Sequence, residues 1–221
     1  MDFITFLFDF VLHLDQHLNM LIANYGSWTY AILFLIVFME TGLVVTPFLP
    51  GDSLLFAAGT FAALGSLDPI ILFLLLTTAG ILGDTVNYSV GAYIGPRAFS
   101  GEIKFLKQEH LDRTHEFYEK HGGKTIILAR YIPIIRTFAP FVAGIGAMTY
   151  SRFILFNVVG AISWVGIFVF GGYFFGNLPL VQNHFEIVIM TIIFISLIPA
   201  VWEFFQHRRA LQKEGAELEE A

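Results

Sequence analysis

The chain has 221 residues, of which 56% are hydrophobic and only 14% are charged, against roughly 25% charged residues in an average globular protein. Its net charge of −6 excludes nucleic-acid binding as a main role, because no basic face can neutralise phosphates, and its lack of cysteine excludes disulfides, thiolate metal sites and cysteine nucleophiles. The composition therefore predicts an all-α polytopic membrane protein.

Three parts of the chain are predicted in order. Residues 1–24 should form an interfacial helix, because its polar side chains gather on one side. These side chains are Asp9, His13, Gln16 and Asn19. Residues 25–206 should form the membrane domain, and residues 207–221 a charged cytoplasmic tail. The membrane domain comprises a first half, an amphipathic surface helix and a second half, at about 25–97, 103–121 and 125–206.

Apolar segments within the membrane domain predict its helices. Four of them are long enough to cross a bilayer. They lie at 28–46, 70–96, 150–176 and 185–205. Two shorter segments, at 47–66 and 125–148, are interrupted by prolines.

Basic residues set the predicted orientation. Residues 1–96 contain no Lys or Arg, nine of the twelve fall between Arg97 and Arg152, and the last three close the chain. Since basic loops stay cytoplasmic, the 97–124 segment and the C-terminus share the inner side. This side assignment requires each of the two shorter segments to enter and leave the membrane on one side. We therefore expect two opposed re-entrant helical hairpins, with both termini in the cytoplasm.

The two halves also share an order of small and helix-breaking residues. The expected hairpin breaks are Pro47, Pro50, Gly51, Pro133 and Pro140. Each broken segment then runs to two small or branched residues and a glycine, at 57–59 and 142–144. Opposite orientation with such similarity indicates an inverted repeat, whose discontinuous segments meet near the midplane. The alternative is that Gly and Pro are simply common in membrane helices.

Five ionisable residues fall within the membrane segments, where each costs roughly 2.5–3.5 kcal/mol on insertion scales. They are Glu40, Asp52, Asp84, Arg130 and Arg136. The three acids are candidates for proton or cation coupling. The alternatives are a helix N-cap for Asp52 and a position at the outer interface for Glu40. For Asp84 they are the counter-ion of an arginine or a helix–helix hydrogen bond.

The two arginines are candidates for binding phosphate, because a guanidinium stays ionised and matches phosphate in a two-pronged geometry. They could instead form structural ion pairs with Glu40 or Asp52, or extend to the cytoplasmic interface. The sequence has no Walker A motif and no Gly-x-Ser-x-Gly elbow, and its histidines fall in interfacial or loop segments. We therefore expect no enzymatic activity, no cofactor and no metal.

Two stretches carry a family resemblance. They are Glu40-Thr41-Gly42 with Pro50-Gly51-Asp52, and the run from Ala129 to Gly144 that contains both arginines. Together they closely resemble the bacterial DedA family, whose membrane domain is shared with eukaryotic lipid-scrambling proteins. The resemblance spans roughly residues 25–205, and it departs at Ile134, where many relatives have Gly.

The resemblance implies an inner-membrane transporter that depends on the proton-motive force and serves the cell envelope. It maps a required acidic pair onto Glu40 and Asp52 and a basic pair onto Arg130 and Arg136. The expected function is a flippase for an anionic lipid, with undecaprenyl phosphate as the leading substrate and another phospholipid possible. The alternatives are a proton-coupled exporter of small solutes and a non-transporting envelope scaffold. A homo-oligomer is possible, because two Gly-x-x-x-Gly pairs permit close helix contact.

Overall fold

The computed structural model describes residues 13–43, 51–99, 123–146, 148–196 and 198. In these ranges every regular element is an α-helix. The helices are α2 (Leu14–Tyr25), α3 (Trp28–Gly42), α4 (Gly51–Ala63), α5 (Pro69–Phe99), α7 (Lys124–Ala129), α8 (Pro133–Ile145), α9 (Tyr150–Phe175), α10 (Pro179–Asn183) and a last helix, Phe185–Ser196, here called the C-terminal helix. The described part of the chain is thus all-α, as expected.

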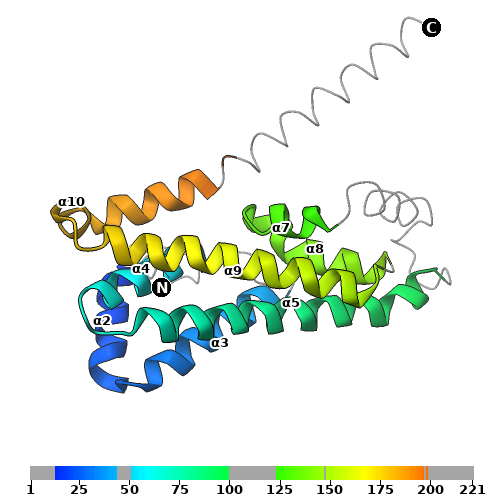
Figure 1. Cartoon of the computed structure of the whole chain (residues 1–221), viewed down its shortest axis with the longest axis horizontal. Helices are drawn as coiled ribbons and strands as arrows, with labels where there is room; N and C mark the ends of the chain where they lie inside the picture. The colour runs from blue at the N-terminus through cyan, green and yellow to red at the C-terminus, as the bar shows by residue number, and fades with distance from the viewer. Residues whose placement is uncertain (1–12, 44–50, 100–122, 147, 197, 199–221) are drawn as a thin grey trace, which may run out of the picture.

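Two long helices form the frame of the molecule. α5 and α9 are in contact and run along the long axis (Figure 1). Apolar stretches of 27 residues in α5 and 26 residues in α9 are long enough to cross a bilayer. They match the expected segments 70–96 and 150–176. In the expected segments 28–46 and 185–205, the described helices are shorter, at Trp28–Gly42 and Phe185–Ser196.

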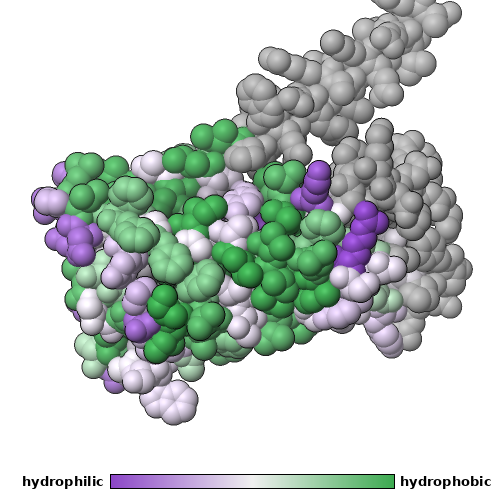
Figure 2. Space-filling view, in the orientation of Figure 1, coloured by the Kyte–Doolittle hydropathy of each residue, from purple (hydrophilic) through white to green (hydrophobic). Residues whose placement is uncertain are grey.

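The outer surface suits a hydrocarbon environment. Large apolar side chains are exposed on each of the long helices and on the C-terminal helix, including Leu74 (60%), Leu155 (60%) and Ile187 (61%). Figure 2 shows hydrophobic residues spread over most of the visible face of the body. Soluble monomers rarely expose contiguous apolar areas of this kind, so this surface fits contact with lipid chains.

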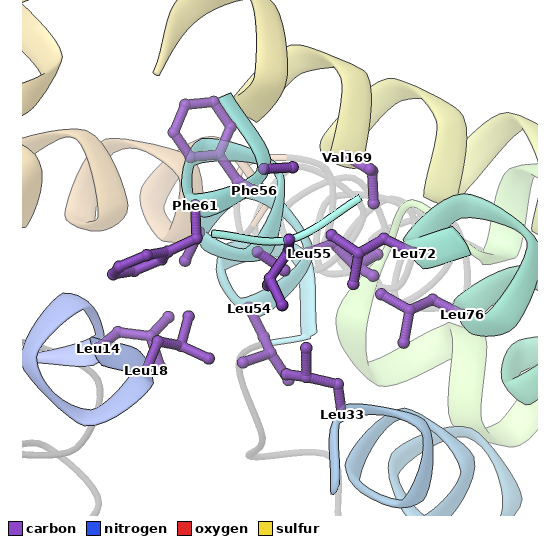
Figure 3. Close-up of a cluster of buried hydrophobic side chains, with 14 of the residues drawn as sticks. Leu14, Leu18, Leu33, Leu54, Leu55, Phe56, Phe61, Leu72, Leu76 and Val169 are labelled. Carbon is purple, nitrogen blue, oxygen red and sulfur yellow. The ribbon is translucent and has the colours of Figure 1, made fainter. Parts of the chain in front are cut away.

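The helix α4 is the centre of the packing. Every residue from Gly51 to Ala62 is buried, because apolar or small residues occupy all sides of the helix and its one charged residue, Asp52, forms an ion pair inside the protein. Side chains from α2, α3, α5 and α9 converge on it (Figure 3). With 13 residues, α4 is roughly 20 Å long, shorter than the bilayer's hydrocarbon core. α8 has the same length.

Pairs of glycines bring the short helices against the long ones. α4 crosses α9 at Gly59 and Gly172, where an added Cβ would meet the backbone of the facing helix. α8 crosses α5 in the same way at Gly144 and Gly91. These glycines let the two backbones approach closely, so both Gly-x-x-x-Gly pairs of the sequence have packing partners within the chain.

One expected hairpin break is wrong. Pro140 lies inside α8, which continues through it to Ile145. A proline in a helix removes only the bond from its own N–H to the carbonyl four residues earlier, here that of Arg136, and close packing against α5 supports the rest. Pro133 does mark a break, because α7 ends at Ala129 and α8 begins at Pro133.

Several expectations fall outside the described residues. These are Pro47 and Pro50, the surface helix at 103–121, the tail at 207–221 and the first twelve residues of the N-terminal helix. The part of the N-terminal helix that is described, α2, buries Leu14 and Leu18 against the core. Its apolar face therefore contacts protein.

The crossing of α4 and α9 gives a first prediction. In Gly172→Ala the new methyl group would meet the carbonyl of Phe56, so we expect a loss of about 1–3 kcal/mol in the free energy of unfolding. The measurement is unfolding of the purified protein in mixed micelles. Gly171→Ala is the matched control, since its Cβ would lie 3.9 Å from the Phe56 ring, an ordinary contact. Equal stability of the two variants would contradict the tight crossing.

Candidate functional site

The five ionisable residues expected within the membrane come together in one buried cluster. Each is contributed by a different segment: the end of α3, the start of α4, the middle of α5, the turn after α7 and the first turn of α8. All are at most 7% exposed. They are Glu40, Asp52, Asp84, Arg130 and Arg136.

A close helix crossing lies beside the acids of α3 and α5. The backbones of α3 and α5 nearly touch at Gly42 and Gly83, where a Cβ on Gly42 would lie 3.3 Å from the Cα of Gly83. Each glycine is close in sequence to an acid, Glu40 or Asp84. Asn87, one turn beyond Asp84, donates hydrogen bonds to the carbonyls of Thr41 (3.3 Å) and Thr137 (2.7 Å). The residues that follow Glu40 and Arg136 are thus fixed to the same side chain.

Arg136 forms ion pairs with two carboxylates. One of its terminal nitrogens, Nη2, pairs with Glu40, and the other, Nη1, lies 2.7 Å from Oδ1 of Asp52. Arg130 pairs with Asp84 at 2.5 Å. Two positive charges therefore face three negative charges, so the fully ionised cluster has a net charge of −1.

Asp52 is held by donors from three elements. Its Oδ1 accepts hydrogen bonds from Arg136 and, at 2.8 Å, from the indole N–H of Trp164, while Oδ2 accepts one from the hydroxyl of Ser196 at 2.7 Å. The sequence left open a capping role for Asp52. The structure instead places it in the first turn of α4 with its carboxylate bonded to side chains of α8, α9 and the C-terminal helix.

Glu40 has fewer partners than Asp52. Its Oε1 accepts bonds from Arg136 and from the backbone N–H of Gly51 at 3.2 Å, while Oε2 is buried with no hydrogen-bond partner in the described part of the chain. Gly51 is required for this approach, because a Cβ there would overlap the Glu40 carboxylate. The Nε of Arg136 is likewise buried and has no partner within the described ranges. Among the residues that the structure describes, the cluster thus holds one acceptor and one donor without a hydrogen-bond partner.

Arg130 donates hydrogen bonds to a separate set of acceptors. Besides Asp84, it donates to the backbone carbonyls of Gly80 (3.3 Å) and Asn157 (3.2 Å). The amide of Asn157 in turn donates to the carbonyl of Ile81 at 3.1 Å, which ties α9 to α5. The sequence analysis offered Glu40 or Asp52 as ion-pair partners of Arg130, and the structure instead pairs this buried arginine with Asp84.

Trp164 is a site residue that the sequence analysis missed. It is fully buried, and its ring faces both guanidiniums, with distances from Cζ to the ring centroid of 5.5 Å for Arg130 and 5.2 Å for Arg136. These distances permit cation–π attraction. A single tryptophan in an apolar helix gives no charge signal, and Ser196 gives none either, so neither could be found from the sequence.

Comparisons with known proteins agree with one another. The family model of the VTT domain matches residues 49–174. The chain is 55% identical to Protein DedA of Escherichia coli K12 over 213 residues, which are 95% of this chain and 97% of that protein. It is 44% identical to an uncharacterized membrane protein of Mycobacterium leprae over 75% of each chain. It is 32% identical to the inner membrane protein YqjA of Escherichia coli K12 over 78% of this chain and 79% of that protein. No solved structure matches.

The Arg130–Asp84 pair gives a second prediction. Arg130→Met should lower the free energy of unfolding by about 3–5 kcal/mol, because it leaves the Asp84 carboxylate buried without its counter-ion. Arg130→Met with Asp84→Leu should recover most of that loss, since removal of both charges is close to neutral. The measurement is unfolding of purified variants in mixed micelles. A double variant as unstable as Arg130→Met alone would show that this pair is not the main partner of either charge.

Proposed function

The chain belongs to the DedA family of membrane proteins, and from this premise we propose that it is a proton-motive-force-dependent flippase for an anionic lipid. The proposed substrate is undecaprenyl phosphate, returned across the cytoplasmic membrane. Its phosphate would bind at Arg130 and Arg136, while its hydrocarbon chain stays in apolar surroundings. The head group crosses unchanged, so the proposed role needs no enzymatic step, no cofactor and no metal.

The observation that carries the proposal is the buried cluster of two arginines and three acids. Buried charges are costly, and a cluster of five in a small membrane protein is a candidate functional site by default. Since the ionised cluster already has a net charge of −1, a phosphate would compete with the carboxylates for the same guanidiniums. Protonation of one or more acids would remove this competition, which links anion binding to proton uptake.

Glu40 is the proposed first proton acceptor. Its Oε2 is buried and lacks a partner among the described residues, whereas both oxygens of Asp52 accept hydrogen bonds. A proton on Glu40 would weaken its hold on Arg136 and leave that guanidinium shared between Asp52 and a phosphate. Asp84 would have the corresponding role beside Arg130.

We also propose that α4 and α7–α8 belong to two opposed re-entrant hairpins of an inverted repeat. Two features support this proposal. Each half pairs a 13-residue helix with a long one of the other half through a glycine pair, α4 with α9 and α8 with α5. The first turns of the two short helices also meet at the Asp52–Arg136 pair, and helix N-termini favour anions. Both chain termini would lie in the cytoplasm.

A second candidate is proton-coupled transport of a small cationic solute. The net charge of −1 favours it, because a cation could bind at the free acceptor of Glu40 without displacing an arginine. In that case Arg130 and Arg136 would serve as fixed counter-ions. The two candidates differ in whether a phosphate head group moves.

The test is translocation of a fluorescent polyprenyl phosphate in proteoliposomes, with and without a pH gradient. We expect gradient-stimulated movement by the wild type, and a fall of about tenfold or more in the initial rate for both Arg136→Ala and Glu40→Gln. Arg152→Ala is the matched control, since this arginine is exposed at the start of α9 and outside the cluster. Its rate should equal that of the wild type.

Two results would overturn the proposal. Movement no faster than in protein-free liposomes, with folded protein in the membrane, would exclude the lipid substrate and favour the small-solute alternative. Full activity of Arg136→Ala and Glu40→Gln would exclude the cluster as the site. A fluorescent polyprenyl alcohol serves as the head-group control, and it should not respond to the gradient.

A further inference from the structure

An apolar groove lies between α4, α9 and the C-terminal helix. Its volume is about 650 Å³, within the range of small-molecule sites. Its walls are aliphatic or aromatic except at His184 and Thr191, and the hydroxyl of Thr191 already donates to the carbonyl of Ile187 at 2.7 Å. The groove thus offers hydrocarbon contacts and no free hydroxyl donor from Thr191.

The groove begins one helical turn from the Asp52 carboxylate on each of its three walls. Phe56 in α4 lies four residues after Asp52 itself. In α9 and the C-terminal helix, the residues that donate to Asp52 are Trp164 and Ser196. Phe168 lies four residues after Trp164, and Ile192 lies four residues before Ser196. Since residues four apart are neighbours on a helix face, the groove and the partners of the Asp52 carboxylate lie one helical turn apart on each of the three helices.

The groove also runs along α9 from the middle of this helix to its C-terminal end. Trp164 lies near the middle of α9, and the residues of α9 that line the groove, from Ile167 to Phe175, continue from there to the end of the helix. The groove therefore reaches from the middle of the span toward one membrane boundary. Ile187, on its rim, is 61% exposed, so the groove is open to the surrounding lipid.

We infer that this groove holds the hydrocarbon chain of a lipid monophosphate whose head group is bound at Arg136. The inference rests on the proposed function and adds the position of the lipid's hydrocarbon chain. A polar cluster one helical turn from an apolar groove matches an amphiphile, with one charged end and one long apolar end. Because lipid chains are as apolar as the groove, it supplies packing and a fixed path, with no hydrophobic gain over the bilayer.

The first test locates the hydrocarbon chain of the lipid directly. The protein has no cysteine, so one fluorophore can be attached at Ile187→Cys on the groove rim or at Ile195→Cys, outside the groove on the same helix. The two positions are matched in exposure, at 61% and 59%. An alkyl monophosphate with a nitroxide at its chain end should quench the Ile187 probe at a concentration at least about threefold lower than the concentration needed to quench the Ile195 probe. The nitroxide-tagged alcohol should quench both alike.

Equal quenching at both positions, or equal quenching by alcohol and phosphate, would mean that the groove holds bulk lipid only, and would overturn the inference. This result does not depend on transport, so it stands whether or not the protein moves lipid. Quenching at Ile187 that requires the phosphate would support the inference even if no translocation were found. The second test uses transport.

Larger side chains that fill the groove should exclude the hydrocarbon chain of the lipid from it. A leucine at Gly171→Leu would extend toward Phe56, since a Cβ there would lie 3.9 Å from its ring, and Thr191→Phe would fill the groove from the opposite wall. Each should slow translocation of polyprenyl phosphate about tenfold. Gly166→Leu is the matched control on α9, because its Cβ would face Phe73 of α5, outside the groove.

The two proposals fail in distinguishable ways. If the wild type moves no polyprenyl phosphate, the proposed function fails, and the quenching test still decides the groove. If the wild type moves it and both Gly171→Leu and Thr191→Phe do so at the wild-type rate, the groove inference alone fails. Two blocking variants from different helices keep the test decisive if one of them does not fold.

Discussion

A single guanidinium, that of Arg136, is shared by two buried carboxylates, and the arrangement of the helices depends on it. In a buried setting an unpaired carboxylate or guanidinium is strongly destabilising, so Glu40, Asp52 and Arg136 hold one another in place. Glu40 and Asp52 come from the consecutive helices α3 and α4, whereas Arg136 comes from α8, far away in sequence. Trp164 and Ser196 extend the same network to α9 and the C-terminal helix. Five elements thus meet at one pair of carboxylates.

Small residues make this convergence possible. Charged side chains can share partners only if the helices that carry them approach closely, and glycines at the crossings allow that approach. Gly42 and Gly83 bring α3 to α5, and Gly51 admits the Glu40 carboxylate against the start of α4. The glycines therefore position the ion pairs, because they allow the backbones of the helices that carry the charges to come into contact.

The helix content, the two long spans and the five charges could be predicted from the sequence, because apolar length and buried charge are read from residue types alone. Which arginine pairs with which acid could not be, since α3 and α8 are separated by about ninety residues and pairing depends on packing. Trp164 was missed because a tryptophan among apolar residues is typical of any membrane helix. Pro140 was misjudged because tertiary contacts hold α8 together around a missing hydrogen bond.

The separation of the two arginines has a consequence for how the cluster would operate. Trp164 faces both guanidiniums, and each arginine has its own acids, Asp84 for Arg130 and the Glu40–Asp52 pair for Arg136. Release of one arginine from its acid would therefore leave the other pair intact. In the proposed function, a phosphate would therefore first displace a carboxylate from one guanidinium while the other arginine keeps its ion pair, so the cluster would open one pair at a time.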